Sequence, residues 1–290
     1  MFARCAWIGL GVMGFPMAGH LVTRGGIELT VYNRSPEKAA RWASQYRGQT
    51  AATPREAVRQ ADLVFACVGN EDDLRQVATG PDGAFHGMKE GAVFVDHTTA
   101  SATVARELYA EAKARKLGFV DAPVSGGQAG AENGILTVMC GGGAEDYNKA
   151  EPAISHYSRM RKLLGPSGSG QLAKMVNQIA IAGLVQGLAE AIQFGINAGL
   201  DMEAVVDVIS KGAAGSWQMD NRHKAMIAGK FDFGFAVDWM RKDLGICLEE
   251  ARANGSHLPV TALVDQFYSE IQKIGGKRWD TSSLIARFQR

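Results

Sequence analysis

Short apolar runs alternate with longer amphipathic segments through the first half of the chain. The runs end at glycine or at turn residues, and we predict strands at residues 6–8, 29–32, 63–68, 93–95 and 119–120. Residues 15–24 have helical periodicity and stop at Gly25-Gly26, while Ser35-Pro36 is typical of a helix start. Short strands that alternate with helices predict a parallel sheet with helices on both faces.

The pattern changes at about Gly170, where long helical segments replace the short apolar runs. One helix is predicted over 171–200, and others over 202–211, 216–228, 238–254, 259–273 and 280–288. Glycine, proline and serine cluster at 164–170, which is typical of a boundary between domains. The chain is therefore predicted to be α/β, with a doubly wound (Rossmann) parallel sheet at 1–164 and an all-α domain at 165–290.

Residues 179–200 are apolar enough to be mistaken for a membrane span. Polar residues interrupt them at helical spacing, at Gln186, Glu190, Gln193 and Asn197. This spacing favours a buried helix, so we expect no membrane partner. The segment also carries small residues at 183, 187 and 191, and it is apolar around most of its circumference. One small domain does not cover such a helix on all sides, which predicts a homodimer or homotetramer.

Composition argues against several other classes of protein. The chain has 290 residues with 31 basic and 30 acidic side chains, so no charge excess suggests a nucleic-acid partner. The four cysteines are far apart and the six histidines have no ligand spacing, so we expect neither disulfides nor a metal. Free thiols and the absence of a secretory pattern before the first strand favour a cytoplasmic protein.

A glycine-rich loop follows the first predicted strand and leads into the first predicted helix. Its spacing is G-x-G-x-x-G, formed by Gly9, Leu10, Gly11, Val12, Met13 and Gly14. The first glycine of this pattern permits a tight turn, the second lets the backbone approach a pyrophosphate, and the third lets helix and strand pack closely. The N-terminus of the helix then faces the anion. Because a strand and a helix flank the loop, we predict that it binds a nicotinamide dinucleotide.

The second predicted strand ends where such folds contact the adenosine ribose. Sites that prefer NAD usually carry Asp or Glu there, whereas this chain has Asn33, Arg34 and Ser35. The guanidinium of Arg34 can pair with a 2′-phosphate, and its two neighbours can add hydrogen bonds. The segment therefore favours NADP as the cofactor. The alternative is that Arg34 is a solvated surface cation and that NAD is accepted as well.

Three further segments join the glycine loop in a family resemblance. They are Asp121–Gly127 (DAPVSGG), Gly168–Asn177 (GSGQLAKMVN) and Met240–Gly245 (MRKDLG). In their order and spacing they resemble the β-hydroxyacid dehydrogenase family, which includes 3-hydroxyisobutyrate dehydrogenase. The resemblance covers essentially the whole chain. It implies an oxidoreductase that moves a hydride between NADP(H) and a small 3-hydroxy acid or semialdehyde.

The resemblance also implies a role for each matching position. Lys174 matches the catalytic lysine, and Asn177 matches an asparagine that helps to hold the substrate. The loop that binds the substrate carboxylate corresponds to Ser125, Gly126 and Gly127. The predicted cofactor contacts beyond the ribose segment are Val68, Gly69, Asp73, Thr99 and Lys242. The chain departs from the family pattern at Gln178, where a second asparagine is common, and at Val68-Gly69, which replaces Leu-Pro.

The chemistry of carbonyl reduction points to the same lysine. Hydride arrival builds negative charge on the carbonyl oxygen, and a nearby ammonium group can stabilise this charge and then donate its proton. Lys174 and Asn177 are three positions apart, so they share one face of the predicted helix. We expect Asp121 and Asp243 to orient neighbours, and we assign His97 a surface or packing role. Trp217 either lines the substrate pocket or fills the core.

Other electrophiles fit the same motifs. Glyoxylate, succinic semialdehyde and tartronate semialdehyde are alternative substrates, as is serine for a dehydrogenase of this type. Imine reductases share the fold but usually lack the lysine that corresponds to Lys174, which favours carbonyl chemistry here. A non-catalytic dinucleotide-binding interaction module is an alternative of a different class, although such modules tend to lose the lysine.

Overall fold

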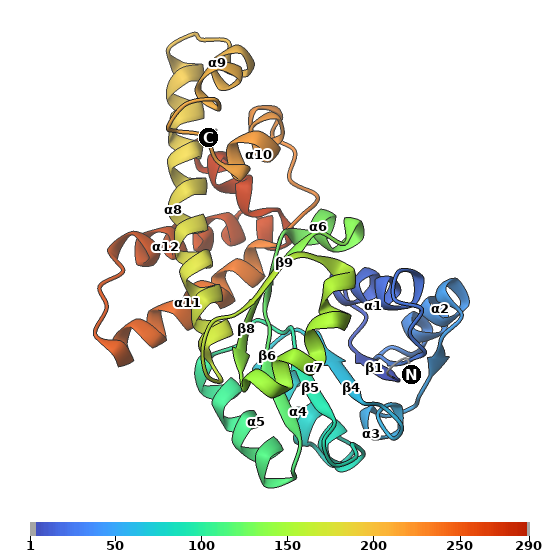
Figure 1. Cartoon of the computed structure of the whole chain (residues 1–290). Coiled ribbons are helices and arrows are strands. Elements are labelled where there is room, and N and C mark those ends of the chain that lie inside the picture. The colour runs from blue at the N-terminus through green and yellow to red at the C-terminus, as the bar shows by residue number, and fades with distance from the viewer. Residues whose placement is uncertain (1–3, 289–290) are drawn as a thin grey trace. The chain divides into compact units, whose positions relative to one another are not determined.

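The computed structural model describes residues 4–288, which form two compact units that divide between Lys174 and Met175. The first unit is a sheet with helices packed on it, and the second is built from helices (Figure 1). Helix α8 (Ser169–Asn197) begins in the first unit and continues into the second. The domain boundary predicted at 164/165 lies just before this helix.

The sheet of the first unit has the strand order β3-β2-β1-β4-β5-β6-β8-β7, and β9 pairs with β8. The strands are β1 (Cys5–Ile8), β2 (Leu29–Tyr32), β3 (Gln49–Thr50), β4 (Leu63–Ala66), β5 (Val93–Asp96), β6 (Gly118–Asp121), β7 (Val124–Ser125), β8 (Leu136–Gly142) and β9 (Ser158–Leu163). Strands β1 to β6 are parallel in the order 3-2-1-4-5-6, which is that of a dinucleotide-binding doubly wound fold. The predicted fold class is confirmed.

Strand β3 and the last three strands, β7 to β9, are absent from the sequence prediction. Strand β8 is antiparallel to β6 and β7 and parallel to β9, so the sheet is mixed at this end. Residues 136–142 (LTVMCGG) are mostly buried and do not alternate between apolar and polar positions, so periodicity does not distinguish them from a buried helix. Strand β9 is largely exposed and carries basic residues, so its sequence lacks the usual signature of a strand.

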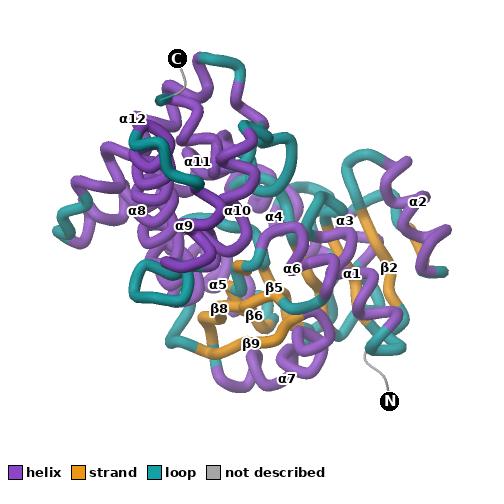
Figure 2. Tube along the Cα trace, turned by 90° about the horizontal axis from the view of Figure 1, so that it is seen from above, coloured by secondary structure: helices purple, strands orange, loops and turns teal. Residues whose placement is uncertain are grey.

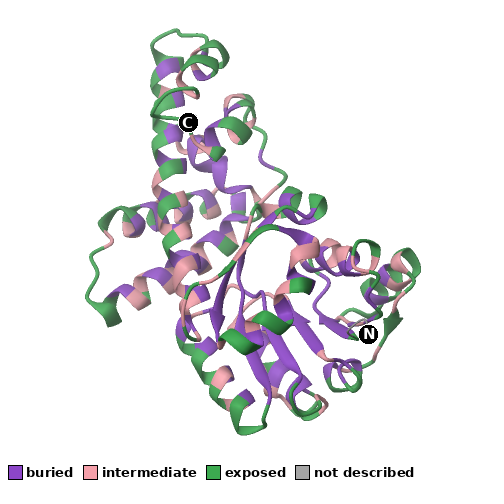
Figure 3. Cartoon of the chain, in the orientation of Figure 1, coloured by how far each residue is buried: buried purple, intermediate pink, exposed green. Residues whose placement is uncertain are grey.

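Helices cover both faces of this sheet (Figures 1 and 2). They are α1 (Gly14–Thr23), α2 (Pro36–Tyr46), α3 (Pro54–Ala57), α4 (Glu71–Thr79), α5 (Ala102–Ala114), α6 (Gly127–Asn133) and α7 (Ala144–Ile154), with 3₁₀ turns η1 (Ala84–His86) and η2 (Ser155–Tyr157). Trp7 and Phe65 pack in one core cluster with α1, α2 and α7, whereas Ile8 and Val64 pack in another with α3, α4 and α5. Because both faces are covered, the central strands are buried along their length (Figure 3).

The second unit contains the rest of α8 and four further α-helices among the described residues. These are α9 (Met202–Ile209), α10 (Trp217–Ala228), α11 (Val237–Asn254) and α12 (Pro259–Lys273), followed by the 3₁₀ segments η3 (Gly276–Arg278) and η4 (Thr281–Arg287). The predicted helices are confirmed to within a few residues, except the last, which is 3₁₀. Asp280 is the N-cap of this last segment, and its carboxylate accepts hydrogen bonds from the backbone and the hydroxyl of Ser282.

Helix α8 is the one helix in residues 4–288 that could cross a membrane by length and composition alone. Of its most apolar window, 39% is buried within the chain. Val176, Leu184 and Phe194 are among its exposed apolar side chains. The core helix of a water-soluble protein meets the same criteria, so the expected absence of a membrane stays a prediction.

His97 is enclosed by aromatic rings directly after β5. It stacks on Trp7 and Phe65, and Tyr157 meets its ring edge-on. The carbonyl oxygen of Ala122 lies 2.6 Å from His97 Nδ1, and the Tyr157 hydroxyl lies 2.8 Å from Nε2. A carbonyl can only accept, so Nδ1 carries the proton and Nε2 accepts from the hydroxyl. His97 therefore has the packing role, and burial lowers its pKa to about 4.

We predict that acid destabilises the protein through His97. An unfolded chain binds this proton below about pH 6.5, whereas the folded chain resists it until about pH 4. Stability that is present above pH 6.5 is therefore lost as the pH falls through this window, by roughly 3 kcal/mol at about 1.36 kcal/mol per pKa unit. Urea unfolding at pH 7 and pH 5 should show a smaller loss of stability for His97→Gln than for the unmodified protein. The exposed His257→Gln is the control, and an equal loss in all three proteins would contradict the assignment.

Candidate active site

The glycine loop lies at the point where the strand order reverses, between β1 and β4. Gly9 follows β1 with a φ of +94°, and a Cβ there would lie 2.3 Å from the carbonyl oxygen of Cys67, just after β4. Open α/β sheets bind ligands outside the carboxyl ends of their strands at such a switch point. The predicted strand, loop and helix context of the motif is therefore present.

The other two glycines of the motif have different surroundings. A Cβ on Gly14 would lie 2.1 Å from the carbonyl oxygen of Gly9, which also accepts a hydrogen bond from Trp7 Nε1 at 2.9 Å. A Cβ on Gly11 would meet nothing within 4 Å. Gly14 is thus required for packing of α1 on β1, whereas Gly11 leaves space beside the loop. Met13, the N-cap of α1, makes no side-chain capping bond, but the Phe15 N–H donates to the carbonyl of Gly11 at 3.0 Å and Pro16 has no N–H. The space for an anion therefore lies beside Gly11, at the N-terminus of α1.

The three residues after β2 that are predicted to contact the ribose, Asn33, Arg34 and Ser35, make different contacts. Asn33 Oδ1 accepts a hydrogen bond from the backbone of Leu10 at 2.9 Å, and Asn33 Nδ2 donates to the carbonyl of Ser35 at 3.1 Å. Asn33 therefore holds the glycine loop, a role that the sequence prediction does not include. Arg34 is 84% exposed and forms an ion pair with Asp73, with 2.9 Å between Nη1 and Oδ1. Ser35 is the N-cap of α2, but its side chain makes no capping hydrogen bond.

The loops after β4 and β5 are joined by hydrogen bonds. The backbone of Val68 donates to Thr98 Oγ1 at 3.1 Å, and the backbone of Thr98 donates to Asp96 Oδ1 at 2.9 Å. Gly69 follows Val68, and Thr99 follows Thr98. The two segments predicted to contact the nicotinamide half of a cofactor therefore lie next to each other at the carboxyl edge of the sheet.

A buried carboxylate holds the start of helix α8. The two oxygens of Asp121 accept hydrogen bonds from the backbone of Gly168 at 2.8 Å and of Gln171 at 3.0 Å. A Cβ on Gly170 would lie 2.8 Å from the same carboxylate, so glycine is needed for this approach. Burial raises the pKa of Asp121, while the backbone N–H groups act in the opposite direction. The predicted orienting role of Asp121 has a structural basis in this anion at a helix N-terminus.

Gln171, in the first turn of α8, forms hydrogen bonds with the loop after β5 on both sides of Thr99. Its Nε2 donates to the carbonyl of Thr98 at 2.7 Å, and its Oε1 accepts from the backbone of Ala100 at 3.1 Å. The side chain is completely buried. The sequence prediction misses Gln171, although a polar residue on the buried side of an apolar helix, three positions before Lys174, is a signal for such a role.

Lys174 lies one helical turn after Gln171 and is only 7% exposed. Lysine is seldom buried to this extent without a partner. Because Asp121 and Gln171 hold the preceding turn, the position of Lys174 is set relative to the loops after β5 and β6. Lys174 therefore belongs to the same unit as the glycine loop, and it lies near the carboxyl edge of the sheet.

The predicted carboxylate loop follows β6. Ser125 ends β7, and Gly126 and Gly127 have φ values of +131° and +62°, which L side chains rarely adopt. A Cβ on Gly127 would meet nothing within 4 Å. The loop therefore exposes backbone that a side chain would otherwise cover, as binding of a carboxylate requires.

In the second unit, the predicted residues Asn177 and Lys242 belong to one polar network. Asn177 Nδ2 donates to Gln178 Oε1 at 2.8 Å, and Gln178 Nε2 donates to Asp243 Oδ2 at 2.7 Å. The ammonium of Lys242 lies 3.2 Å from Asp243 Oδ1. Gln178 and Asp243 are both buried, so the departure from the family pattern at 178 has a structural role between α8 and α11. Asp243 contacts Lys242 and Gln178, in keeping with its predicted orienting role.

Trp217 begins α10 and is 46% exposed, so it does not fill the core. Its ring packs against the guanidinium of Arg222, whose Cζ lies 4.7 Å from the ring centre. Arg222 is held in turn by Asp280 at 3.1 Å. Of the two predicted alternatives for Trp217, the exposed ring is compatible with a pocket wall.

Comparison with known proteins agrees with this arrangement. Residues 4–165 match the family model described as the NAD-binding domain of 6-phosphogluconate dehydrogenase. Residues 168–288 match the model described as NAD-binding of NADP-dependent 3-hydroxyisobutyrate dehydrogenase. Together these two models cover both units.

Full-length relatives are similar over nearly the whole chain. An uncharacterised oxidoreductase of Shewanella frigidimarina is 64% identical, with 99% of each chain covered. The NAD-dependent L-serine dehydrogenase of Pseudomonas aeruginosa is 33% identical, with 98% of this chain and 97% of that protein covered.

A solved structure shows the same fold. The crystal structure of 3-hydroxyisobutyrate dehydrogenase from Salmonella typhimurium superimposes with a TM-score of 0.88 at 29% identity, and it covers 99% of this chain and 100% of its own. The dinucleotide loop, the buried lysine of α8 and these relatives lead to one assignment. The chain belongs to the β-hydroxyacid dehydrogenase family and is an NAD(P)-dependent dehydrogenase of hydroxy acids.

Proposed function

We propose that the enzyme interconverts a small 3-hydroxy acid and its semialdehyde with a preference for NADP(H), and that Lys174 is its general acid and base. The observation that carries this proposal is the placement of Lys174. It is a buried lysine, one turn after a helix start that Asp121 and Gln171 tie to the loops at the carboxyl edge of the sheet. An ammonium group held there can stabilise an alkoxide and transfer a proton to it.

The residues of the first unit fit a dinucleotide. The space beside Gly11, at the N-terminus of α1, suits a pyrophosphate, and Arg34 after β2 suits a 2′-phosphate. When bound, the nicotinamide supplies or accepts the hydride. The protein then has to hold the substrate carboxylate, for which we assign Ser125, Gly126 and Gly127. It also has to move one proton at the substrate oxygen, for which we assign Lys174.

Asn177 follows Lys174 by three positions on α8, so it is suited to contact the same substrate. We assign Asn177 and Trp217 to substrate binding, and Lys242 to the substrate or cofactor. Oxidation is the reverse of this path, with Lys174 accepting the proton from the hydroxyl group.

The substrate class includes serine, which is itself a 3-hydroxy acid. The name of the P. aeruginosa relative supports a serine-type dehydrogenase with NAD as a second candidate. Glyoxylate and succinic semialdehyde remain candidates for the reductive direction. Rates of NADP⁺ and NAD⁺ reduction with 3-hydroxyisobutyrate or L-serine, and rates of NADPH and NADH oxidation with these aldehydes, separate the candidates. We also propose a cytoplasmic location, for which the wide spacing of the four cysteines along the sequence is the support.

We predict that Lys174→Ala lowers kcat by a factor of roughly 10² to 10⁴, the usual range for a positioned acid or base. Binding of NADPH, measured by fluorescence titration, should change little, since other residues hold the pyrophosphate and ribose. Lys174→Arg keeps the positive charge, but guanidinium does not release a proton near neutral pH, so it should not restore turnover. If Lys174→Arg retained most of the activity, Lys174 would act through its charge alone, and proton transfer would need another donor.

We predict that Arg34→Asp moves the cofactor preference from NADPH towards NADH. The substitution removes a charge-assisted contact to the 2′-phosphate, worth roughly 1.5–3 kcal/mol, and places a carboxylate near the ribose hydroxyls. The measurement is the ratio of kcat/KM for the two cofactors. Arg59→Asp, an exposed charge reversal before β4 at the opposite edge of the sheet, is the control. Equal efficiency with both cofactors in the unmodified enzyme would count against the preference.

We predict that the enzyme is a homodimer or homotetramer that covers helix α8 between subunits. The helix exposes Val176, Leu184 and Phe194 and carries small residues at 183, 187 and 191. Exposed apolar surface of this kind favours association with another apolar surface. Light scattering at micromolar concentration should give a dimer or larger species. Phe194→Glu should shift the distribution towards monomer, whereas an unmodified monomer would refute the prediction.

A further inference from the structure

The guanidinium of Arg34 already has an anionic partner. Asp73, in the first turn of α4, places Oδ1 at 2.9 Å from Arg34 Nη1. The side chain of Arg34 is 84% exposed and that of Asp73 is 29% exposed. Both residues lie at the carboxyl edge of the sheet, in the unit that holds the glycine loop. A 2′-phosphate that approaches Arg34 therefore meets a cation that a carboxylate has partly neutralised.

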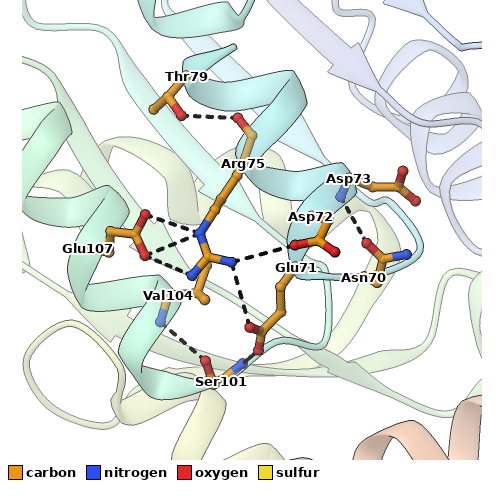
Figure 4. Close-up of polar contacts among 9 residues, drawn as sticks. All are labelled: Asn70, Glu71, Asp72, Asp73, Arg75, Thr79, Ser101, Val104 and Glu107. Atoms are coloured by element: carbon orange, nitrogen blue, oxygen red, sulfur yellow. Dashed lines mark hydrogen bonds and ion pairs between the residues drawn. The ribbon is translucent and has the colours of Figure 1, made fainter.

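Asp73 differs from the two other acidic residues in the same helical turn. Glu71 and Asp72 lie 3.9 Å from Arg75, and Glu71 also accepts a hydrogen bond from the backbone of Ser101 at 2.6 Å. Arg75 in turn binds Glu107 at 2.8 Å. In Figure 4 the carboxylates of Glu71 and Asp72 are turned towards Arg75, which lies one turn further along the same helix. The carboxylate of Asp73 points away from Arg75. Asp73 is thus the acid of this turn that pairs with Arg34.

The location of Asp73 does not depend on its own charge. Its backbone N–H donates to Oδ1 of Asn70, the N-cap of α4, at 2.8 Å (Figure 4). The carboxylate adds little to the cap, so its replacement by an isosteric amide should leave the helix in place.

We propose that Asp73 sets the strictness of cofactor selection by competing with the 2′-phosphate of NADP for the guanidinium of Arg34. NADP binding requires the guanidinium to leave or to share the carboxylate. NAD has no 2′-phosphate, so this cost does not apply to it. Asp73 thereby lowers the advantage of NADP and leaves NAD usable. This inference rests on the proposed role of Arg34 in the preference for NADP.

The test compares Asp73→Asn with Asp72→Asn. Both variants remove one negative charge from the same helical turn, but Asp72 faces Arg75 instead of Arg34. The probes are adenosine 2′,5′-bisphosphate and 5′-AMP, with binding measured by calorimetry, together with NADPH and NADH by fluorescence. We expect Asp73→Asn to tighten the 2′-phosphorylated ligands roughly threefold to tenfold at low salt, in line with the removal of one nearby charge in water. Binding of 5′-AMP and NADH should not tighten, and the gain should shrink as salt screens the charges.

A double variant establishes whether the effect passes through Arg34. In the Arg34→Ala background, Asp73→Asn should change the affinity for adenosine 2′,5′-bisphosphate by less than about twofold, because no guanidinium is left to release. A full effect in that background would overturn the competition and leave direct repulsion of the phosphate. An equal effect of Asp72→Asn, or weaker binding in Asp73→Asn, would also overturn it.

Failure of the underlying cofactor assignment gives a different pattern. If the unmodified enzyme bound the bisphosphate no better than 5′-AMP, and Arg34→Ala changed neither affinity, the preference for NADP would itself be wrong. If discrimination were present and lost in Arg34→Ala, but unaffected by Asp73→Asn, the role of Arg34 would stand and that of Asp73 would fall.

Discussion

The bonds between the carboxylate of Asp121 and the first turn of α8 are the contact on which the candidate site depends. A long helix leaves unsatisfied N–H groups at its start, and Asp121 supplies a buried anion to two of them, those of Gly168 and Gln171. The helix start cannot shift without breaking these bonds in a place that water does not reach. Lys174, one turn further, takes its position from this attachment.

Gln171 links the same helix start to the loop after β5. Its amide satisfies the backbone on both sides of Thr99, and Thr98 in turn holds the backbone of Val68. The loops after β4 and β5 and the helix that carries the lysine therefore form one hydrogen-bonded assembly. In the proposed function, this assembly sets the distance between the nicotinamide and the ammonium group of Lys174, which catalysis by positioning requires.

Much of this could be predicted from the sequence, because the relevant signals are local. The strand, glycine loop and helix at 5–23 follow from an apolar run and three glycines, and the helical second unit follows from its periodicity. The roles of Asn33 and Gln171 could not be predicted, because each depends on a partner distant in sequence, the backbone of Leu10 and the loop around Thr99. Strand β8 could not be predicted either, because a segment buried on both faces does not alternate between apolar and polar residues.

Helix α8 carries Lys174 and Asn177 in one uninterrupted backbone, although the two residues belong to different compact units. One residue inserted between them would turn Asn177 by about 100° around the axis and advance it by about 1.5 Å. For the proposed joint action of Lys174 and Asn177 on one substrate, the number of residues between them therefore matters as much as their identity.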